Sequence, residues 1–217
     1  MSRIQQSEVT IETADARLNG EAWLPAGAPG IVLFAHGSGS SRFSTRNRYV
    51  AGELVRAGIG TLLFDLLTPE EEQLDAVDRS LRFDIGLLTQ RLAGATRWLA
   101  REEWARSLGV GYFGASTGAA AALAASVGCD VQAVVSRGGR PDLAGAALPH
   151  VTAPTLLIVG SHDPIVVDLN RQALARLACE AQLEIVPGAT HLFEEPGTLE
   201  QVAKLAGNWF RRWLHEV

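Results

Sequence analysis

The sequence has little cysteine, no surplus of positive charge and no long apolar run, and each absence excludes a class of protein. Cys129 and Cys179 are the two cysteines, and they form no CxxC pair. We therefore expect buried free thiols and not a disulfide framework or a redox motif. Lysine and arginine number 19 against 24 aspartates and glutamates, for a net charge of −5. Phosphate backbones are also negatively charged and would be repelled, so we expect no nucleic-acid partner.

Apolar runs are short throughout the chain. None approaches the roughly 18 consecutive apolar residues of a membrane-spanning helix, so we expect no membrane partner. Residues 1–13 lack the basic start and the apolar block of a signal peptide, which predicts a cytoplasmic protein. Hydrophobic residues make up 47% of the 217 positions, and we expect residues 1–217 to form a single domain with one substantial core.

Short runs rich in Val, Ile and Leu alternate with longer stretches at helical spacing, which predicts an α/β fold. A short connection joins the first two strands, so they should pair antiparallel. Helices separate the later strands, which should run parallel. The expected strands are residues 7–13, 18–24, 30–36, 59–65, 108–113, 131–136, 154–160 and 182–187. The expected helices are residues 44–57, 80–104, 116–127, 167–178 and 198–215.

Other segments bear on how a site could be built. The run AAAALAA at residues 119–125 should let its helix pack close to the sheet. Residues 66–79 contain a proline and three consecutive glutamates and are expected to form a solvated loop. They follow a strand, at the edge where open α/β sheets bind ligands, so this loop is expected at the rim of a site. The interval between the strands ending at residue 136 and beginning at residue 154 leaves no room for a lid domain.

A nucleophile motif follows the strand at residues 108–113. Gly114-Ala115-Ser116-Thr117-Gly118 leads directly into a helix, which is the strand, turn and helix context of a G-x-S-x-G elbow. The glycines are needed because the serine occupies a sharp turn that brings its neighbours close to other backbone. Ser116 is the candidate nucleophile.

A serine hydroxyl needs a base, and the base needs an orienting carboxylate. Elbows of this kind are followed in chain order by the acid and then by the histidine, each after a strand. Asp163 follows the strand at 154–160 and His191 follows the strand at 182–187, so these two residues complete the predicted catalytic triad. Asp168, expected inside a helix, and Asp142 are weaker candidates for the acid.

The remaining histidines have simpler interpretations. His162, His150 and His215 are expected to be turn or surface residues. His36, in the loop His36-Gly37-Ser38-Gly39-Ser40-Ser41, is expected to fix that loop. An oxyanion hole requires two backbone N–H groups, and we assign them to Thr117, which follows the nucleophile, and to Ser38 in this loop.

With these residues in place, the sequence resembles a small, lidless α/β-hydrolase of the dienelactone hydrolase-like branch. The resemblance spans nearly the whole chain and rests on HGSGSS, GASTG, VGSHDPIV and PGATHLFEEPG, in family order. It implies a mostly parallel eight-stranded sheet with helices on both faces. The chain is also similar to hydrolase modules joined to phosphoribosyltransferase domains. Dienelactone hydrolases have cysteine at the elbow, whereas this chain has Ser116, which favours serine esterase chemistry.

Arginines gather near the expected site. They either pair with the glutamates at 70–72 or bind a substrate carboxylate. The arginines considered are Arg42, Arg46, Arg48, Arg137 and Arg140, of which Arg42, Arg46 and Arg137 are the candidates for substrate binding.

Several functions are compatible with these residues. A serine hydrolase that cleaves small carboxylic esters or lactones through an acyl-enzyme is the main hypothesis. An acyltransferase or thioesterase using the same triad and a non-catalytic binding module remain alternatives. A dinucleotide site is disfavoured, because Arg42 replaces the third glycine of the fingerprint Gly37-x-Gly39. No cluster has metal-ligand spacing, so we expect neither a metal nor an organic cofactor.

Overall fold

The computed structural model describes residues 4–217 and contains one eight-stranded sheet in the order β1-β2-β4-β3-β5-β6-β7-β8. β1 pairs antiparallel with β2, and β2 pairs antiparallel with β4. All other neighbours are parallel, so β3 to β8 end at the same edge of the sheet. The predicted α/β fold and strand directions are confirmed. The strands are β1 (Ile4–Glu12), β2 (Arg17–Pro25), β3 (Gly30–Ala35), β4 (Gly60–Phe64), β5 (Gly109–Ala115), β6 (Ala133–Arg137), β7 (Thr155–Gly160) and β8 (Ala181–Val186).

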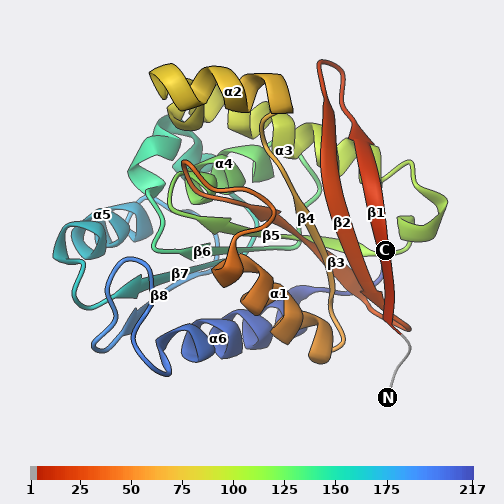
Figure 1. Ribbon diagram of the computed structural model, residues 1–217. Coiled ribbons are helices and arrows are strands. Elements are labelled where there is room, and N and C mark those ends of the chain that lie inside the picture. The colour runs from red at the N-terminus through yellow and green to blue at the C-terminus, as the bar shows by residue number, and fades with distance from the viewer. Residues whose placement is uncertain (1–3) are drawn as a thin grey trace.

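Helices cover both faces of this sheet (Figure 1). α1 and α6 pack together on one face, whereas α3, α4 and α5 lie on the other. Each layer buries its own cluster of apolar side chains against the strands, which is the usual source of stability for such a sheet. The helices are α1 (Thr45–Arg56), α2 (Pro69–Asp78), α3 (Ile85–Leu99), α4 (Thr117–Ser126), α5 (Pro164–Leu174) and α6 (Thr198–Trp213), with 3₁₀ segments η1 (Leu81–Phe83), η2 (Glu103–Ala105) and η3 (Pro141–His150).

α4 begins directly after β5 and lies in the interior. The side chains of Ala119, Ala120, Ala121 and Ala122 are fully buried. Because these side chains are small, the helix axis can approach the sheet closely, as the alanine run predicted. The N-terminus of α4 is thereby held at the edge where the parallel strands end.

The prediction of a loop over residues 66–79 is wrong, because residues 69–78 form α2. Thr68 Oγ1 accepts a 3.2 Å hydrogen bond from the Glu71 backbone, and the Glu71 carboxylate accepts a 2.8 Å hydrogen bond from the Thr68 N–H. This capping box, with Pro69 in the first turn and acidic side chains near the helix N-terminus, stabilises a helix that apolar periodicity does not reveal.

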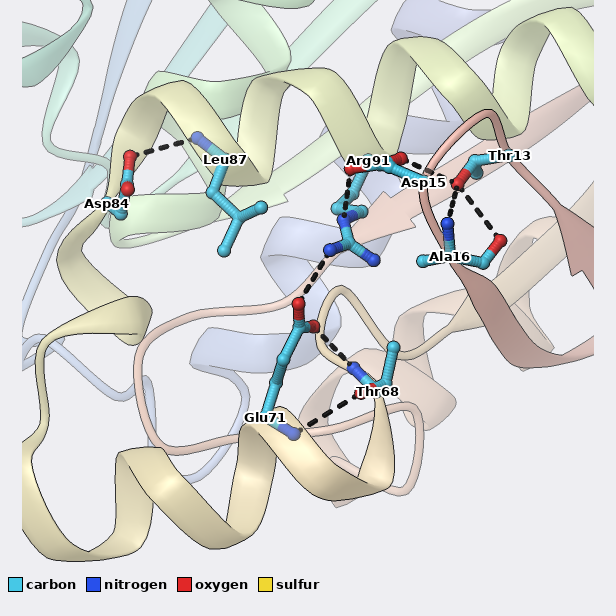
Figure 2. A network of polar contacts seen from close by, with 8 residues as sticks. All are labelled: Thr13, Asp15, Ala16, Thr68, Glu71, Asp84, Leu87 and Arg91. Carbon is cyan, nitrogen blue, oxygen red and sulfur yellow. Dashed lines mark hydrogen bonds and ion pairs between the residues drawn. The ribbon is translucent and has the colours of Figure 1, made fainter.

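α2 is fastened to the rest of the molecule by Arg91 of α3 (Figure 2). The Arg91 guanidinium lies 2.6 Å from the Glu71 carboxylate and 3.4 Å from Asp15, in the turn between β1 and β2. Its side chain is 4% exposed, so the guanidinium depends on these two carboxylates. One buried cation therefore joins the hairpin, α2 and α3.

Other boundaries also differ from the predictions. The helix expected over 80–104 is shorter, because Asp84 caps the N-terminus of α3 by accepting a hydrogen bond from the Leu87 N–H. The segment between β6 and β7 contains η3. Cys129 and Cys179 are free, as expected, but they are half-buried. No helix among residues 4–217 has the length and apolar character needed to cross a membrane.

Candidate active site

Ser116 occupies a strained turn between β5 and α4. Its φ of 52° and ψ of −119° are unusual for a residue with a side chain. A Cβ on Gly118 would lie 2.1 Å from the Ala35 carbonyl oxygen, and one on Gly114 would lie 2.4 Å from Ala119 Cα. Only glycine fits at these two positions. The geometry is that of the nucleophile elbow predicted from GASTG.

The backbone around Ser116 is held by the segment that follows β6. The Ser116 N–H donates a 3.2 Å hydrogen bond to the Arg137 carbonyl, and the Ser116 carbonyl accepts a 3.1 Å hydrogen bond from the Arg140 N–H. The serine itself is half-buried. Residues 137–140 therefore help to hold the elbow in its strained conformation.

Asp163 and His191 are paired at the same edge of the sheet. His191 Nδ1 lies 2.6 Å from Asp163 Oδ2, within hydrogen-bond distance. Asp163 comes after β7 and is the N-cap residue of α5, whereas His191 comes after β8. If Nδ1 donates to the carboxylate, Nε2 remains free to accept a proton, which is the tautomer that a general base needs.

Gly138 links the histidine loop to the serine elbow. Its own φ is 52°, and a Cβ added to it would lie 3.6 Å from both Nδ1 and Cε1 of His191. The preceding residue, Arg137, accepts the hydrogen bond from Ser116. The hydrogen bonds of residues 4–217 do not include one between the Ser116 hydroxyl and His191. Such contacts often close only when substrate binds.

The loop after β3 lies against the elbow. A Cβ on Gly37 would be 3.2 Å from Ser116 Cβ, so the start of this loop packs against the serine one residue before Ser38. Ser38 is exposed, in a turn closed by the hydrogen bond from the Ser40 N–H to the Gly37 carbonyl. Thr117 is the first residue of α4, so its N–H has no acceptor in a preceding turn. Thr117 thus adjoins Ser116 in the chain, and Ser38 adjoins the glycine that packs against it.

The ends of this loop are anchored to the two residues that follow β4. His36 Nε2 accepts a 3.0 Å hydrogen bond from the Leu66 N–H, and burial lowers the pKa of His36, so the ring stays neutral. Arg42 donates through its backbone N–H to Asp65 at 2.8 Å, and its guanidinium pairs with the same carboxylate. His36 thus fixes the loop, as its sequence context suggested. Asp65 fixes the other end of the same loop through Arg42.

A cavity of about 470 Å³ opens beside the loop. It contains neither Ser116 nor the Asp163–His191 pair, but Gly37 and Ser38 of the loop line it, and α2 forms its outer wall. The segment predicted as a rim loop is therefore a helix that borders this cavity. Burial raises the pKa of Glu72, and the charge of Asp65 acts in the same direction. The remaining lining residues are His36, Gly39, Ser40, Ser41, Phe43, Ser44, Leu67, Glu72, Asp75, Arg82 and Leu88.

Sequence reasoning missed one residue that holds the histidine loop. The Glu195 carboxylate accepts a 3.0 Å hydrogen bond from the Thr190 N–H and a 2.7 Å hydrogen bond from the Thr190 hydroxyl. These hydrogen bonds lower the pKa of Glu195. Phe193, in the same loop, is buried with φ of 56°. The two acidic residues after His191 were the available signal, because an acid after a tight turn often accepts backbone N–H groups.

The other acidic and histidine candidates are exposed or paired elsewhere. Asp168 is exposed on α5 and pairs with Arg171, and Asp142 pairs with Arg140 at 2.7 Å. His162, His150 and His215 are exposed.

The arginines do not pair with residues 70–72, which corrects that alternative. Glu71 is engaged by Arg91 of α3, and the other two glutamates make no ion pair with the arginines in question. Arg42 pairs instead with Asp65, Arg48 with Glu21 at 2.7 Å, and Arg46 with Glu194 at 3.5 Å. Arg137 is buried.

Comparison with known proteins agrees with this geometry. The model of the dienelactone hydrolase family matches residues 15–215. The chain belongs to the dienelactone hydrolase family. A dienelactone hydrolase from Anabaena variabilis is 57% identical, has a TM-score of 0.96 and aligns over 98% of this chain and 99% of its own. The esterase Est1E from Butyrivibrio proteoclasticus is 13% identical, with a TM-score of 0.78 over 94% and 98% of the two chains, and shares the fold.

Two curated relatives from strains of Mycobacterium tuberculosis are named "putative phosphoribosyl transferase". They are 58% identical over 209 residues, which cover 95% of this chain but 46% of theirs. The chain therefore spans about half the length of these relatives. The resemblance drawn from the sequence motifs is confirmed, and family membership indicates an enzyme that hydrolyses esters.

Proposed function

We propose that this protein is a serine hydrolase of small carboxylic esters or lactones that works through an acyl-enzyme. The observation on which this rests is the 2.6 Å contact between Asp163 and His191 at the sheet edge where Ser116 occupies its strained turn. Nucleophile, base and acid come from three different strand ends. Their chain order is that of the α/β-hydrolases.

In the proposed reaction, Ser116 Oγ attacks the substrate carbonyl carbon while His191 Nε2 takes the hydroxyl proton. Asp163 stabilises the resulting imidazolium. The tetrahedral intermediate collapses, the bond from carbon to the alcohol oxygen breaks, and His191 gives its proton to that oxygen. Water then attacks the acyl-enzyme with His191 again as base, which releases the acid and restores Ser116.

The negative charge on the carbonyl oxygen requires donors that are already in place. The N–H groups of Thr117 and Ser38 are proposed for this role, because Thr117 adjoins Ser116 and Ser38 adjoins Gly37, which packs against Ser116. The loop bearing Ser38 is also anchored at His36 and Arg42. Removing one such donor commonly lowers kcat about 10²- to 10³-fold. The anchoring of the loop therefore bears directly on the rate.

The proposed substrates are small and soluble, because the short segment between β6 and β7 has no room for a lid domain that would cover a long apolar acyl chain. An uncovered long acyl chain would leave its apolar surface in water. We expect acetyl and butyryl esters to be hydrolysed faster than long-chain esters. Transfer of the acyl group to an alcohol or thiol uses the same residues and is the second candidate reaction. The curated relatives are about twice as long as the segment that matches this chain, and the hydrolase proposal concerns that matching segment.

The first test is labelling with a fluorophosphonate, read by intact mass. The wild type should gain one adduct, Ser116→Ala should gain none, and Ser107→Ala, an exposed serine before β5, should label like the wild type. Short-chain p-nitrophenyl esters should be hydrolysed by the two proteins that label. A folded wild type that takes no adduct would refute the hydrolase and favour the binding module.

A further inference from the structure

Arg137, the last residue of β6, is a buried cation without a counter-ion. It is 7% exposed, and its guanidinium makes no hydrogen bond within residues 4–217, with Nε fully buried. None of the ion pairs of the described chain includes it. Its guanidinium contacts the face of the Phe193 ring at 5.8 Å instead. An aromatic face compensates a buried charge only in part.

The environment of Arg137 opposes its charge. Burial lowers the pKa of this guanidinium to about 10, and the positive charge of Arg46 on α1 acts in the same direction. Arg46 is itself poorly matched: its Nε is buried without a partner, and its contact with Glu194 is 3.5 Å long, to a carboxylate that is 64% exposed. Arg46 contacts Glu194 and Arg137 contacts Phe193, so the two guanidinium groups lie against consecutive residues of the histidine loop, and only Arg46 has an acid nearby.

Other arginines of this protein, buried or partly exposed, have carboxylate partners. Arg91 is 4% exposed and pairs with Glu71 and Asp15, whereas Arg82 pairs with the buried Asp75. On α1 itself, Arg48 lies 2.7 Å from Glu21 and stacks on an indole ring. Each has a carboxylate within contact distance. Arg137 differs, which indicates that its anion comes from outside the described chain.

The location of Arg137 puts such an anion near the reacting groups. Its carbonyl accepts the hydrogen bond from the Ser116 N–H, and its guanidinium faces Phe193, two residues after His191. Arg46 begins α1, which follows the loop bearing Ser38. The two guanidinium groups therefore lie on the α1 side of the proposed catalytic residues, and the cavity bordered by α2 lies elsewhere along the same loop.

We propose that Arg137 and Arg46 form a binding site for a phosphate group. A phosphate dianion matches two guanidinium charges, whereas a single carboxylate carries one, and the phosphate oxygens can accept from both side chains at once. The phosphate is either free in solution or carried by the ester substrate. Only the second source rests on the proposed function.

The binding site is tested first without catalysis. Inorganic phosphate added to the Ser116→Ala protein should raise its thermal midpoint, and it should not raise that of Ser116→Ala/Arg137→Met. Arg48→Gln in place of Arg137→Met is the matched control and should keep the full response, because Arg48 already has a partner. Without phosphate, Arg137→Met should melt higher than the wild type, since an uncompensated charge has been removed; a structural arginine would give the opposite shift.

Arg46→Gln provides a second variant at a less buried position, and it should reduce the phosphate response. A response that persists in Arg137→Met, or no response in the parent protein, would overturn the proposal. An equal response to succinate would overturn the assignment to phosphate.

The two sources are distinguished with active enzyme. We compare the p-nitrophenyl esters of butyric acid and of 3-phosphonopropionic acid. If the substrate carries the group, Arg137→Met should lower kcat/KM about 10- to 100-fold for the phosphonate ester and less than about threefold for the butyrate. If the phosphate is free, Arg137→Met should change kcat/KM by the same factor for both esters. Phosphate should still raise the thermal midpoint of the Ser116→Ala protein. Loss of labelling at Ser116 would refute the hydrolase and leave the melting result intact.

Discussion

The backbone N–H of Leu66, just after β4, donates a 3.0 Å hydrogen bond to Nε2 of the buried His36 side chain, just after β3. His36 Nδ1 lies 3.1 Å from the Gly37 carbonyl, so a neutral ring with hydrogen on Nδ1 satisfies both contacts. Protonation of Nε2 would put two donors face to face. The start of the loop that bears Ser38 therefore depends on a histidine that stays neutral.

This dependence predicts how stability varies with pH. Burial lowers the pKa of folded His36 below its ordinary value of 6.5, so the unfolded chain takes up the proton first. The contribution of His36 is complete above pH 6.5 and declines as the pH falls below it, by at most about 1.4 kcal/mol per pH unit. Urea unfolding at pH 7.5 and 5.5 should show this loss in the wild type and in His150→Gln. His36→Gln should show less, and an unchanged loss in that variant would contradict the assignment.

The glycine after the elbow should tolerate no side chain. We expect Gly118→Ala to lower the free energy of unfolding by about 3 kcal/mol or more, because the added Cβ would meet the Ala35 carbonyl at 2.1 Å. Gly128→Ala is the control. Nothing lies within 4 Å of that position and its φ is not left-handed, so the change should be neutral or stabilise by up to about 1 kcal/mol. Equal effects in the two variants would argue against a steric cause.

The acid should matter for turnover and not for binding. Asp163→Asn should lower kcat by about 10⁴-fold with little change in KM, because the amide cannot hold the His191 tautomer that accepts a proton. Asp168→Asn, on an exposed face of the following helix, should leave both constants unchanged. Steady-state kinetics on p-nitrophenyl acetate measure this. A similar kcat for both variants would remove Asp163 from the proposed triad.

The link between α2 and α3 should be a strong determinant of stability. Glu71→Ala should lower the free energy of unfolding by about 2–3 kcal/mol, since it breaks the capping box and removes the nearer of the two partners of buried Arg91. Glu70→Ala, one position earlier and exposed, should change it by less than about 0.5 kcal/mol. In an Arg91→Met background, Glu71→Gln should cost much less than 2 kcal/mol, because no buried charge is left unpaired. Denaturant titration of the variants decides this.

The sheet, its strand directions and the elbow could be predicted because they depend on local signals. Apolar runs give the strands, and two glycines around a serine after a strand give the turn. Apolar periodicity does not reveal α2. Its local signal is the capping box of Thr68 and Glu71, whereas the contact with Arg91 depends on the tertiary fold. The partners of Arg42 and Arg46 could not be predicted either, since Asp65 and Glu194 become neighbours only when the strand ends converge. Charged residues near the site could be predicted from the sequence, but their ion-pair partners could not.

The convergence of strand ends also has a consequence for folding. Ser116 follows β5, Asp163 follows β7, and His191 follows β8. β8 is the outermost strand of the sheet, next to β7. Each of these parallel pairings closes a loop through a helix or a long connection, and such contacts form slowly. A refolding chain can bury much of its core on β3, β4 and β5 while the His191 loop is still unplaced. Recovery of esterase turnover should therefore lag behind the recovery of secondary structure, as the last signal to return.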